Sequence, residues 1–326
     1  MRRQIIELAY PAFVSAALAL IAGCSPESPN SREASEVGEN VSPRPAVQQH
    51  PDGAAPLPGN YKHEETIASY SRLISQDATN PIAFNNWGLL WAAKGEYDKA
   101  IADYSEAIRL DPNYGDAHYN RGVCRYEKGE TYNAIVDFSE ALRINPTDAD
   151  AYSGRANVRF SSEEFDKAIA DFDEAIKLYP NEARDYYHRG SAWHIRGDLD
   201  KAIADYTAAI SINPKYADAY KRRGVARYEK YMYDEALADF TDATRLAPAS
   251  AASYGNRGAA WSRKGEYDKA IADYSESIRL GTSDPLVYFR RGRAWSHKHE
   301  YEKAIADYEV AVQLNPHDAL QNSCLA

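Results

Sequence analysis

The chain has 326 residues, of which 44% are hydrophobic and 26% charged, and its 48 acidic side chains outnumber the 38 basic ones to give a formal net charge of −10. This net charge argues against nucleic acid as a partner and against a chain that lies flat on anionic lipid. The eight histidines do not cluster as zinc ligands do, and the sequence contains no glycine-rich phosphate loop or serine elbow. We therefore expect a protein that is not an enzyme and that needs no metal or cofactor.

The first residues have the layout of a cleaved export signal. Arg2 and Arg3 precede a mostly apolar run from Leu8 to Ala22, which is followed by Gly23 and Cys24. The run is too short to span a bilayer core of about 30 Å with margin. A cysteine directly after small residues resembles the lipobox of bacterial lipoproteins.

The lipobox resemblance implies that residues 1–23 are a lipoprotein signal peptide and that Cys24 becomes the first residue, acylated with a chain such as palmitate. Two alternatives stay open: an ordinary secretory signal with an incidental cysteine, and a twin-arginine signal, whose pattern the first residues match only in part. In such lipoproteins an aspartate after the cysteine usually retains the protein in the inner membrane. Ser25 therefore favours a bacterial outer-membrane lipoprotein that faces the periplasm.

Residues 24–60 are rich in Pro, Ser, Glu and Gly and contain almost no aromatic residue. Such a segment cannot bury enough apolar surface to offset its chain entropy. As a flexible coil it would reach roughly 30 to 36 Å. We expect a disordered tether between membrane and domain.

A 34-residue period then runs through the chain without gaps. Aligning on a recurrent Arg-Gly pair gives seven units that start at Pro81, Gly115, Ala149, Ala183, Ala217, Ala251 and Pro285 and end at Asp318. Position 8 of each unit is Gly or Ala, position 20 is Ala, and position 24 is Tyr or Phe. The small residues predict two closely packed helices in each unit, with the aromatic ring filling the space between them.

Two further patterns define the second helix of each unit. Between Tyr97 and Ile108, apolar residues recur three and four positions apart, which is the stripe of an amphipathic helix. Position 32 is proline in every unit except the sixth, which has Thr282, and proline biases the residue before it out of the helix. We expect the second helix to end there.

The array over residues 81–318 resembles the tetratricopeptide repeat (TPR) family. The resemblance implies an all-α fold, a right-handed superhelical solenoid of seven helix-turn-helix repeats. Residues 66–71 parallel residues 100–105 in sequence, so we expect an N-terminal half-repeat helix that caps the array over residues 61–80. We expect residues 319–326 to be a short C-terminal tail, too short for a polar capping helix, and we infer an apolar end that either this tail or a partner covers.

Charged residues recur at two positions. Position 7 is arginine in repeats 2 to 7, and position 23 is always aspartate. We interpret the two rows as internal ion pairs, because the aspartates are present to neutralise the arginines. The alternative is an arginine row that binds polyanions.

The resemblance also implies a concave groove lined by the first helices. Its central positions hold Tyr119, Tyr126, Phe160, Tyr187, His188, His194, Lys221 and Tyr228. Tyr and His offer flat apolar faces with a polar tip, which suit an extended peptide or a sugar ring, although single aromatics at helical spacing are often packing residues. Some family members clamp a peptide carboxylate; Lys221, Asn256 and Arg290 match three of five positions of that clamp, while Val225 and Leu286 depart from it.

We therefore expect a membrane-anchored scaffold or adaptor that binds an extended peptide or a protein partner of the cell envelope in its groove. Two alternatives remain: a module that binds peptidoglycan or another polysaccharide on the same aromatic residues, and a structural protein that self-associates through its C-terminal end, assisted by Cys324. The partner's identity does not follow from the repeat.

Overall fold

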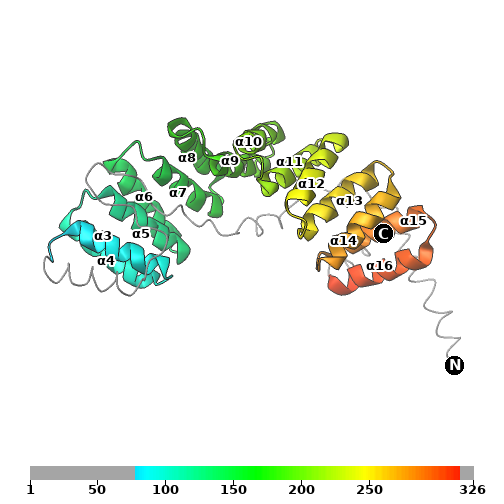
Figure 1. Cartoon of the computed structure of the whole chain (residues 1–326), viewed down its shortest axis with the longest axis horizontal. Helices are drawn as coiled ribbons and strands as arrows, with labels where there is room; N and C mark the ends of the chain where they lie inside the picture. Colours follow the sequence, from blue (N-terminus) through cyan, green and yellow to red (C-terminus); the bar gives the residue numbers. More distant parts are fainter. Residues whose placement is uncertain (1–77, 316–326) are drawn as a thin grey trace, which may run out of the picture. The chain divides into compact units, whose positions relative to one another are not determined.

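The computed structural model describes residues 78–315. These residues form fourteen helices and no strand (Figure 1). In chain order the helices are α3 (Pro81–Ala93), α4 (Tyr97–Leu110), α5 (Gly115–Glu127), α6 (Thr131–Ile144), α7 (Ala149–Ser161), α8 (Phe165–Leu178), α9 (Ala183–Ile195), α10 (Leu199–Ile212), α11 (Ala217–Glu229), α12 (Tyr233–Leu246), α13 (Ala251–Arg263), α14 (Tyr267–Arg279), α15 (Pro285–His297) and α16 (Tyr301–Leu314). Each pair occupies one predicted 34-residue repeat, so the predicted all-α repeat fold is confirmed.

The helices belong to two compact units. In the described part of the chain, the N-terminal unit comprises α3 to α10 and the C-terminal unit comprises α11 to α16. Within each unit, a first helix packs on the second helix of its own repeat and on the second helix of the repeat before it. First helices of neighbouring repeats also touch, as α5 touches α7 and α7 touches α9. They form one continuous surface in each unit, which we call the first-helix face.

Local sequence signals set the helix ends. Side-chain oxygens of Asn80, Asp148, Ser250 and Asp284 accept hydrogen bonds from the first turns of four first helices. Most second helices end two residues before the proline at position 32. In repeat 6, where Thr282 replaces that proline, α14 stops at Arg279 and Gly281 adopts a positive φ of 88°. Glycine tolerates this backbone conformation, so the repeat still turns without its proline.

The core of each repeat is an aromatic ring held against a small residue. The rings of repeats 1 to 6 are almost completely buried, namely Tyr104, Phe138, Phe172, Tyr206, Phe240 and Tyr274, whereas Tyr308 of repeat 7 is partly buried. A Cβ atom added to Gly88 would lie 2.6 Å from the Tyr104 ring, and one added to Gly224 would lie 2.7 Å from the Phe240 ring. A larger residue at position 8 therefore forces the helices apart, as the sequence pattern predicted.

The turn between the two helices of a repeat requires a left-handed backbone at position 15. Gly95, Gly129, Gly197 and Gly265 occupy it with φ of 74° to 82°. Repeats 3, 5 and 7 place Glu163, Tyr231 and His299 there, at φ of 60° to 62°. These three side chains carry a conformational cost that glycine does not.

Several predictions fall outside the described residues: the signal peptide 1–23 with Cys24, the tether 24–60, residues 61–77 of the N-terminal cap, and the tail 319–326 with Cys324. None of the helices within residues 78–315 is long and apolar enough to cross a membrane. Helix α16 exposes large apolar side chains, among them Tyr301 (57% exposed), Val312 (42%) and Leu314 (44%).

Candidate functional site

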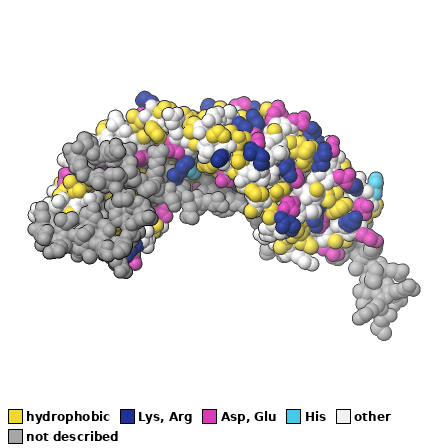
Figure 2. Space-filling view, viewed as in Figure 1, with side chains coloured by type: hydrophobic (Ala, Val, Ile, Leu, Met, Phe, Trp, Pro, Cys, Tyr) yellow, Lys and Arg dark blue, Asp and Glu magenta, His cyan; other side chains and the backbone are white. Residues whose placement is uncertain are grey.

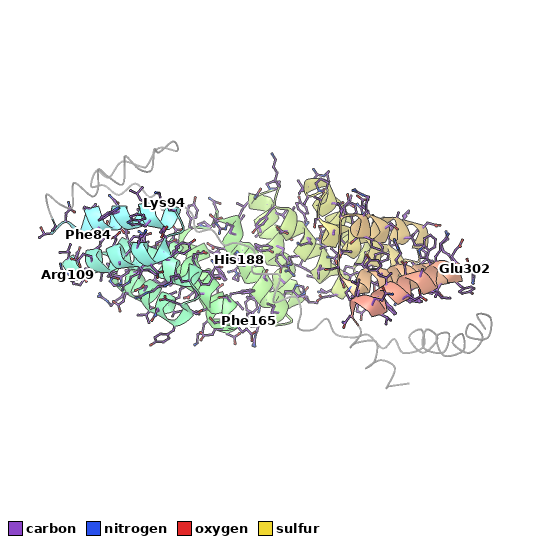
Figure 3. The ribbon with its side chains drawn as sticks, turned by 90° about the horizontal axis from the view of Figure 1, so that it is seen from below. Phe84, Lys94, Arg109, Phe165, His188 and Glu302 are labelled. Atoms are coloured by element: carbon purple, nitrogen blue, oxygen red, sulfur yellow. The ribbon has the colours of Figure 1, made fainter. Side chains whose placement is uncertain are left out.

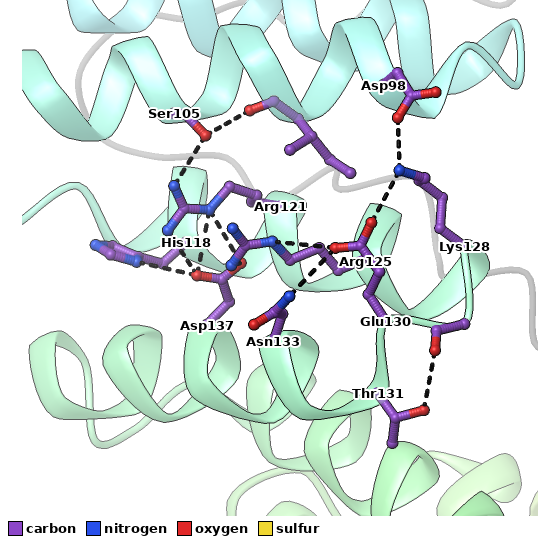
Figure 4. Close-up of polar contacts among 12 residues, drawn as sticks. Asp98, Ser105, His118, Arg121, Arg125, Lys128, Glu130, Thr131, Asn133 and Asp137 are labelled. Carbon is purple, nitrogen blue, oxygen red and sulfur yellow. Dashed lines mark hydrogen bonds and ion pairs between the residues drawn. The ribbon is translucent and has the colours of Figure 1, made fainter.

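The arginines at position 7 and the aspartates at position 23 form buried ion pairs inside each repeat that has both. Arg121 Nη2 lies 2.8 Å from Asp137 Oδ1 (Figure 4). Arg155 Nη2 lies 2.7 Å from Asp171 Oδ1. The other pairs, at 2.6 to 2.7 Å, are Arg189–Asp205, Arg223–Asp239, Arg257–Asp273 and Arg291–Asp307. The predicted internal ion pairs are confirmed, and the arginine row is not free to bind a polyanion.

The same arginines connect consecutive repeats. Arg121 Nη1 donates to the Ser105 hydroxyl of the preceding repeat at 3.0 Å (Figure 4). Arg155 Nη1 donates to the Ser139 hydroxyl in the same way. In repeat 4 the acceptor is a carboxylate, Asp173, at 2.6 Å from Arg189 Nη1. One guanidinium therefore links a first helix to two second helices.

Position 11 shows a difference between repeats that we did not predict. In repeats 2, 3 and 5 it is a second arginine on the same aspartate, as in Arg125–Asp137 at 2.8 Å. In repeats 1, 4, 6 and 7 it is tryptophan, and the lysine at position 19 lies over its ring; Lys201 Nζ is 4.0 Å from the Trp193 centroid. Both arrangements hold the two helices of one repeat together.

Repeat 1 lacks the arginine, because Trp87 occupies position 7. Asp103 consequently has no ion-pair partner among residues 78–315, and burial raises the pKa of its carboxyl to about 6. The indole Nε1 of Trp87 is also buried without a hydrogen-bond partner in the described structure. Counting only partners within residues 78–315, this is the one repeat whose position 23 aspartate has no neighbouring guanidinium.

A pocket opens on the first-helix face of the N-terminal unit. Side chains from α5, α7 and α9 surround it, and Phe138 of α6 forms part of its floor. Gly154 makes room for it, because a Cβ at that position would lie 2.7 Å from the Phe138 ring. The pocket holds about 70 Å³, enough for the end of one side chain but far below the roughly 300 Å³ or more of a site that encloses a whole small molecule.

Five charged side chains contribute to the pocket wall beside its aromatic and aliphatic groups. Glu127, Asp150, Glu182 and Asp185 contribute carboxylates, and Arg184 contributes a guanidinium. Asp185 is only 5% exposed, and burial raises the pKa of its carboxyl to about 7, although a hydrogen bond with Ser153 opposes this shift. Burial also raises the pKa of Glu127.

His188 lines the pocket and is neutral at physiological pH. It lies among the helices of the N-terminal unit, whereas Arg109 lies at the unit's periphery (Figure 3). Its ring stacks on Phe172 with centroids 6.1 Å apart. Burial, reinforced by the charge of Arg184, lowers the pKa of His188 to about 4. The histidine thus presents a flat uncharged ring.

Of the predicted groove residues in the N-terminal unit, the structure brings Tyr119, Tyr126 and His188 together at this pocket. The other three lie outside its lining. Phe160 packs edge-to-face on Phe165 with centroids 5.4 Å apart, Tyr187 lies against Tyr206, and His194 is half-buried near the end of α9.

The predicted residues of the C-terminal unit lie on its own first-helix face. Lys221 Nζ pairs with Asp218 at 2.8 Å, and the Tyr228 hydroxyl accepts a hydrogen bond of 3.0 Å from Arg263 Nε. Asn256 and Arg290 are half-buried on α13 and α15. On the visible surface of this unit, cationic and anionic side chains are interspersed (Figure 2).

Sequence reasoning missed the acidic residues of the pocket, although a signal was present. Position 3 holds Asp185 in repeat 4, and in the other six repeats it holds a small or apolar buried residue, namely Ala83, Ala117, Ala151, Ala219, Ser253 and Val287. A carboxylate at a position that the fold fills with core residues indicates a role other than packing. Among residues 78–315, no group of three or more His, Cys, Asp or Glu side chains is placed to hold a metal ion.

Comparison with known families agrees with the helix pairs. A tetratricopeptide repeat model matches residues 115–148 and 149–182, and a second one matches 285–318, which are predicted repeats 2, 3 and 7. A TPR repeat model matches 88–129 and 190–230, and a further tetratricopeptide repeat model matches 221–285. The chain belongs to the tetratricopeptide repeat family and is a repeat scaffold. No curated protein shows a detectable match to it.

Solved structures share this fold. A tetratricopeptide repeat protein from Parabacteroides merdae is 20% identical, with 78% of this chain and 97% of that chain covered at a TM-score of 0.55. PilF of Pseudomonas aeruginosa is 19% identical, with 65% and 97% covered at a TM-score of 0.56. YrrB, described as a TPR protein with an unusual peptide-binding site, is 24% identical, with 57% and 96% covered at a TM-score of 0.51. At these identities the likeness establishes the fold alone.

Proposed function

We propose that the chain is a non-enzymatic scaffold whose N-terminal unit binds an extended segment of a partner protein on its first-helix face. The observation that carries this proposal is the pocket between α5, α7 and α9, where Tyr119, Tyr126 and His188 meet polar side chains. Its volume fits one side chain of a longer ligand. Flat rings with polar edges contribute contact area to an extended peptide at a low cost in conformational entropy.

The repeat architecture supports the same proposal. First helices stacked side by side offer equivalent positions at regular intervals, so that successive side chains of one peptide can meet successive repeats. YrrB, which has this fold, is described as binding a peptide. On the C-terminal unit we propose Lys221, Asn256 and Arg290 as contacts for a carboxylate of the partner, and Tyr228 as a further contact of the groove.

We further propose that Cys24 anchors the chain to a bacterial outer membrane on the periplasmic side, which makes the partner a protein of the cell envelope. The support is the sequence from Arg2 to Ser25: a basic start, a short apolar run, small residues and then cysteine. Metabolic labelling with a clickable palmitate analogue tests the anchor. The wild-type chain should carry the label and Cys24→Ala should not; equal labelling of both would refute the assignment.

Affinity capture tests the binding proposal. Wild-type protein, Tyr126→Ala and Tyr132→Ala are each immobilised and exposed to detergent-solubilised envelope, and retained proteins are identified by mass spectrometry. Tyr132 is a matched control, because it is 79% exposed on α6 and is not part of the pocket. We expect a protein that Tyr126→Ala loses and Tyr132→Ala retains. Retention of peptidoglycan fragments in place of a protein would favour the glycan alternative instead.

Self-association is a second candidate because α16 exposes Tyr301, Ile305 and Val312, which lie four and seven residues apart on one side of the helix. Analytical ultracentrifugation of wild type and Val312→Lys under reducing and oxidising conditions tests it. Concentration-dependent dimers that the substitution abolishes would support this candidate. A constant monomer mass would remove it, together with any role for Cys324.

A further inference from the structure

We propose that the pocket of the N-terminal unit selects a cationic side chain, that of an arginine or lysine in the bound segment of the partner. The inference rests on the proposed function and adds to it the chemistry of one recognised residue.

The first argument is the position of Asp185. Its carboxyl lies in the pocket wall, is 95% removed from solvent, and makes no ion pair within residues 78–315. The aspartates at position 23 of repeats 2 to 7 are equally buried, but each of them has a guanidinium within about 3 Å. Asp185 has no guanidinium at that distance: Ser153 forms a hydrogen bond with it, and the charge of Arg184 is the weakest of the influences on its carboxyl. A buried carboxylate without a counter-charge in direct contact is costly, and a cationic ligand would reduce that cost.

The second argument is the balance of charge around the pocket. Glu127 faces it from α5, Asp150 from α7, and Glu182 and Asp185 from the start of α9. Arg184 is the only basic residue of the lining, the neutral ring of His188 adds no charge, and α6 contributes Phe138 alone. With all its acidic groups ionised, the lining would carry a net charge of −3. This field attracts a guanidinium or ammonium group and repels a peptide carboxylate.

The third argument is shape. A volume of about 70 Å³ admits the head of one long side chain, and the rings of Tyr119, Tyr126 and His188 offer flat surfaces beside the carboxylates. A guanidinium stacks on aromatic faces while its N–H groups donate to carboxylate oxygens. Gly154 keeps the floor open, and it stands at position 6, where the other repeats have Asn, His or Arg.

Proton linkage follows from the same geometry. At neutral pH the Asp185 carboxyl is partly protonated, since burial raises its pKa to about 7. A cation bound beside it would favour the ionised form, so binding would release a proton and tighten as the pH rises through 7. Glu127, whose pKa is also raised, would act in the same direction, whereas His188 stays neutral throughout this range.

The test compares three tripeptide probes on the full-length chain by saturation-transfer NMR: acetyl-Ala-Arg-Ala-amide, its lysine analogue and its citrulline analogue. Citrulline has the shape of arginine without the charge. We expect the two cationic probes to bind at least tenfold more tightly than the citrulline probe. We expect Asp185→Asn, and separately Asp150→Asn, to remove most of that difference. Asp242→Asn is the matched control, because Asp242 lies on α12 of the C-terminal unit and pairs with Arg245.

Three outcomes would overturn the inference: equal binding of the charged and uncharged probes, a charge preference that survives Asp185→Asn, or no binding of any probe. Circular dichroism shows whether each variant retains its helices, and the comparison of probes on wild-type protein does not depend on any variant. If the envelope capture succeeds while the probes show no charge preference, the binding function stands and the cation inference alone fails.

Discussion

The same substitution should have opposite effects in two repeats. Asp103→Asn in repeat 1 should stabilise the N-terminal unit at neutral pH, whereas Asp171→Asn, at the equivalent position of repeat 3, should destabilise it. Asp103 has no guanidinium partner in the described structure, but Asp171 accepts from Arg155 and Arg159, each at 2.7 Å. Replacing the carboxylate by an amide removes an unpaired buried charge at Asp103. At Asp171 the same change leaves the charges of Arg155 and Arg159 without their carboxylate partner.

The magnitudes follow from the structure. The difference between the ordinary carboxyl pKa of 3.8 and the value of about 6 for Asp103 corresponds to about 3 kcal/mol of unfavourable ionisation. Because that carboxyl is only half-buried, solvent screening reduces the effect to about 1 kcal/mol. Its folded-state pKa is raised, so the protonated form favours folding and stability is lost as the pH rises from about 4 to about 6. Breaking the buried cluster at Asp171 should cost about 3 kcal/mol.

Hydrogen–deuterium exchange measures both effects locally, which matters because repeat arrays need not unfold in one step. At pH 7.5, amides of α4 should exchange roughly fivefold more slowly in Asp103→Asn, and amides of α8 roughly a hundredfold faster in Asp171→Asn. Destabilisation by both substitutions would refute the reasoning, since it would mean that Asp103 is stabilised in its charged form.

Three further predictions concern the turns and the pocket. Glu163→Gly should raise the free energy of unfolding by about 1 kcal/mol, because Glu163 has a φ of 60°, and Gly197→Ala should lower it by about as much. Thermal unfolding would show both effects. A loss of stability in Glu163→Gly would contradict the account. Gly154→Ala should destabilise by about 1 to 3 kcal/mol and weaken partner binding, because the new Cβ would lie 2.7 Å from a buried ring. Gly255→Ala, with its nearest contact at 3.4 Å, should retain both stability and binding. Affinity for the arginine probe should rise about tenfold from pH 6 to pH 8, as a carboxyl with a pKa near 7 ionises, and Asp185→Asn should flatten this profile; titrations at fixed ionic strength would measure it.

Much of the fold could be predicted from the sequence, because residues of the same type recur at the same packing positions in every repeat. A glycine or alanine at position 8 and a ring at position 24 must meet, as Gly88 meets Tyr104. The position 7 and position 23 charges could be paired in advance for the same reason. The two arrangements at position 11 were not predicted. In some repeats an arginine pairs with the position 23 aspartate, and in others a lysine lies over a tryptophan ring. Which of them forms depends on the neighbour that a long side chain reaches in the folded repeat.

The candidate site could be predicted only in part. Family positions indicated the first-helix face, and Tyr119, Tyr126 and His188 do lie at one pocket. Position alone could not separate them from Tyr187, whose ring packs on Tyr206, because aromatics at helical spacing serve binding and packing alike. Asp185 could have been found by asking which repeat departs from the others at a core position.

The most direct test of the central claim is site-specific photo-crosslinking in cells of the native organism, with benzoylphenylalanine placed at position 126 in the pocket or at position 132 on the exposed side of α6. We predict that position 126 forms a covalent adduct with one envelope protein, that position 132 does not, and that Asp185→Asn weakens the adduct. Adducts of equal yield from both positions, or adducts from position 132 alone, would contradict binding on the first-helix face.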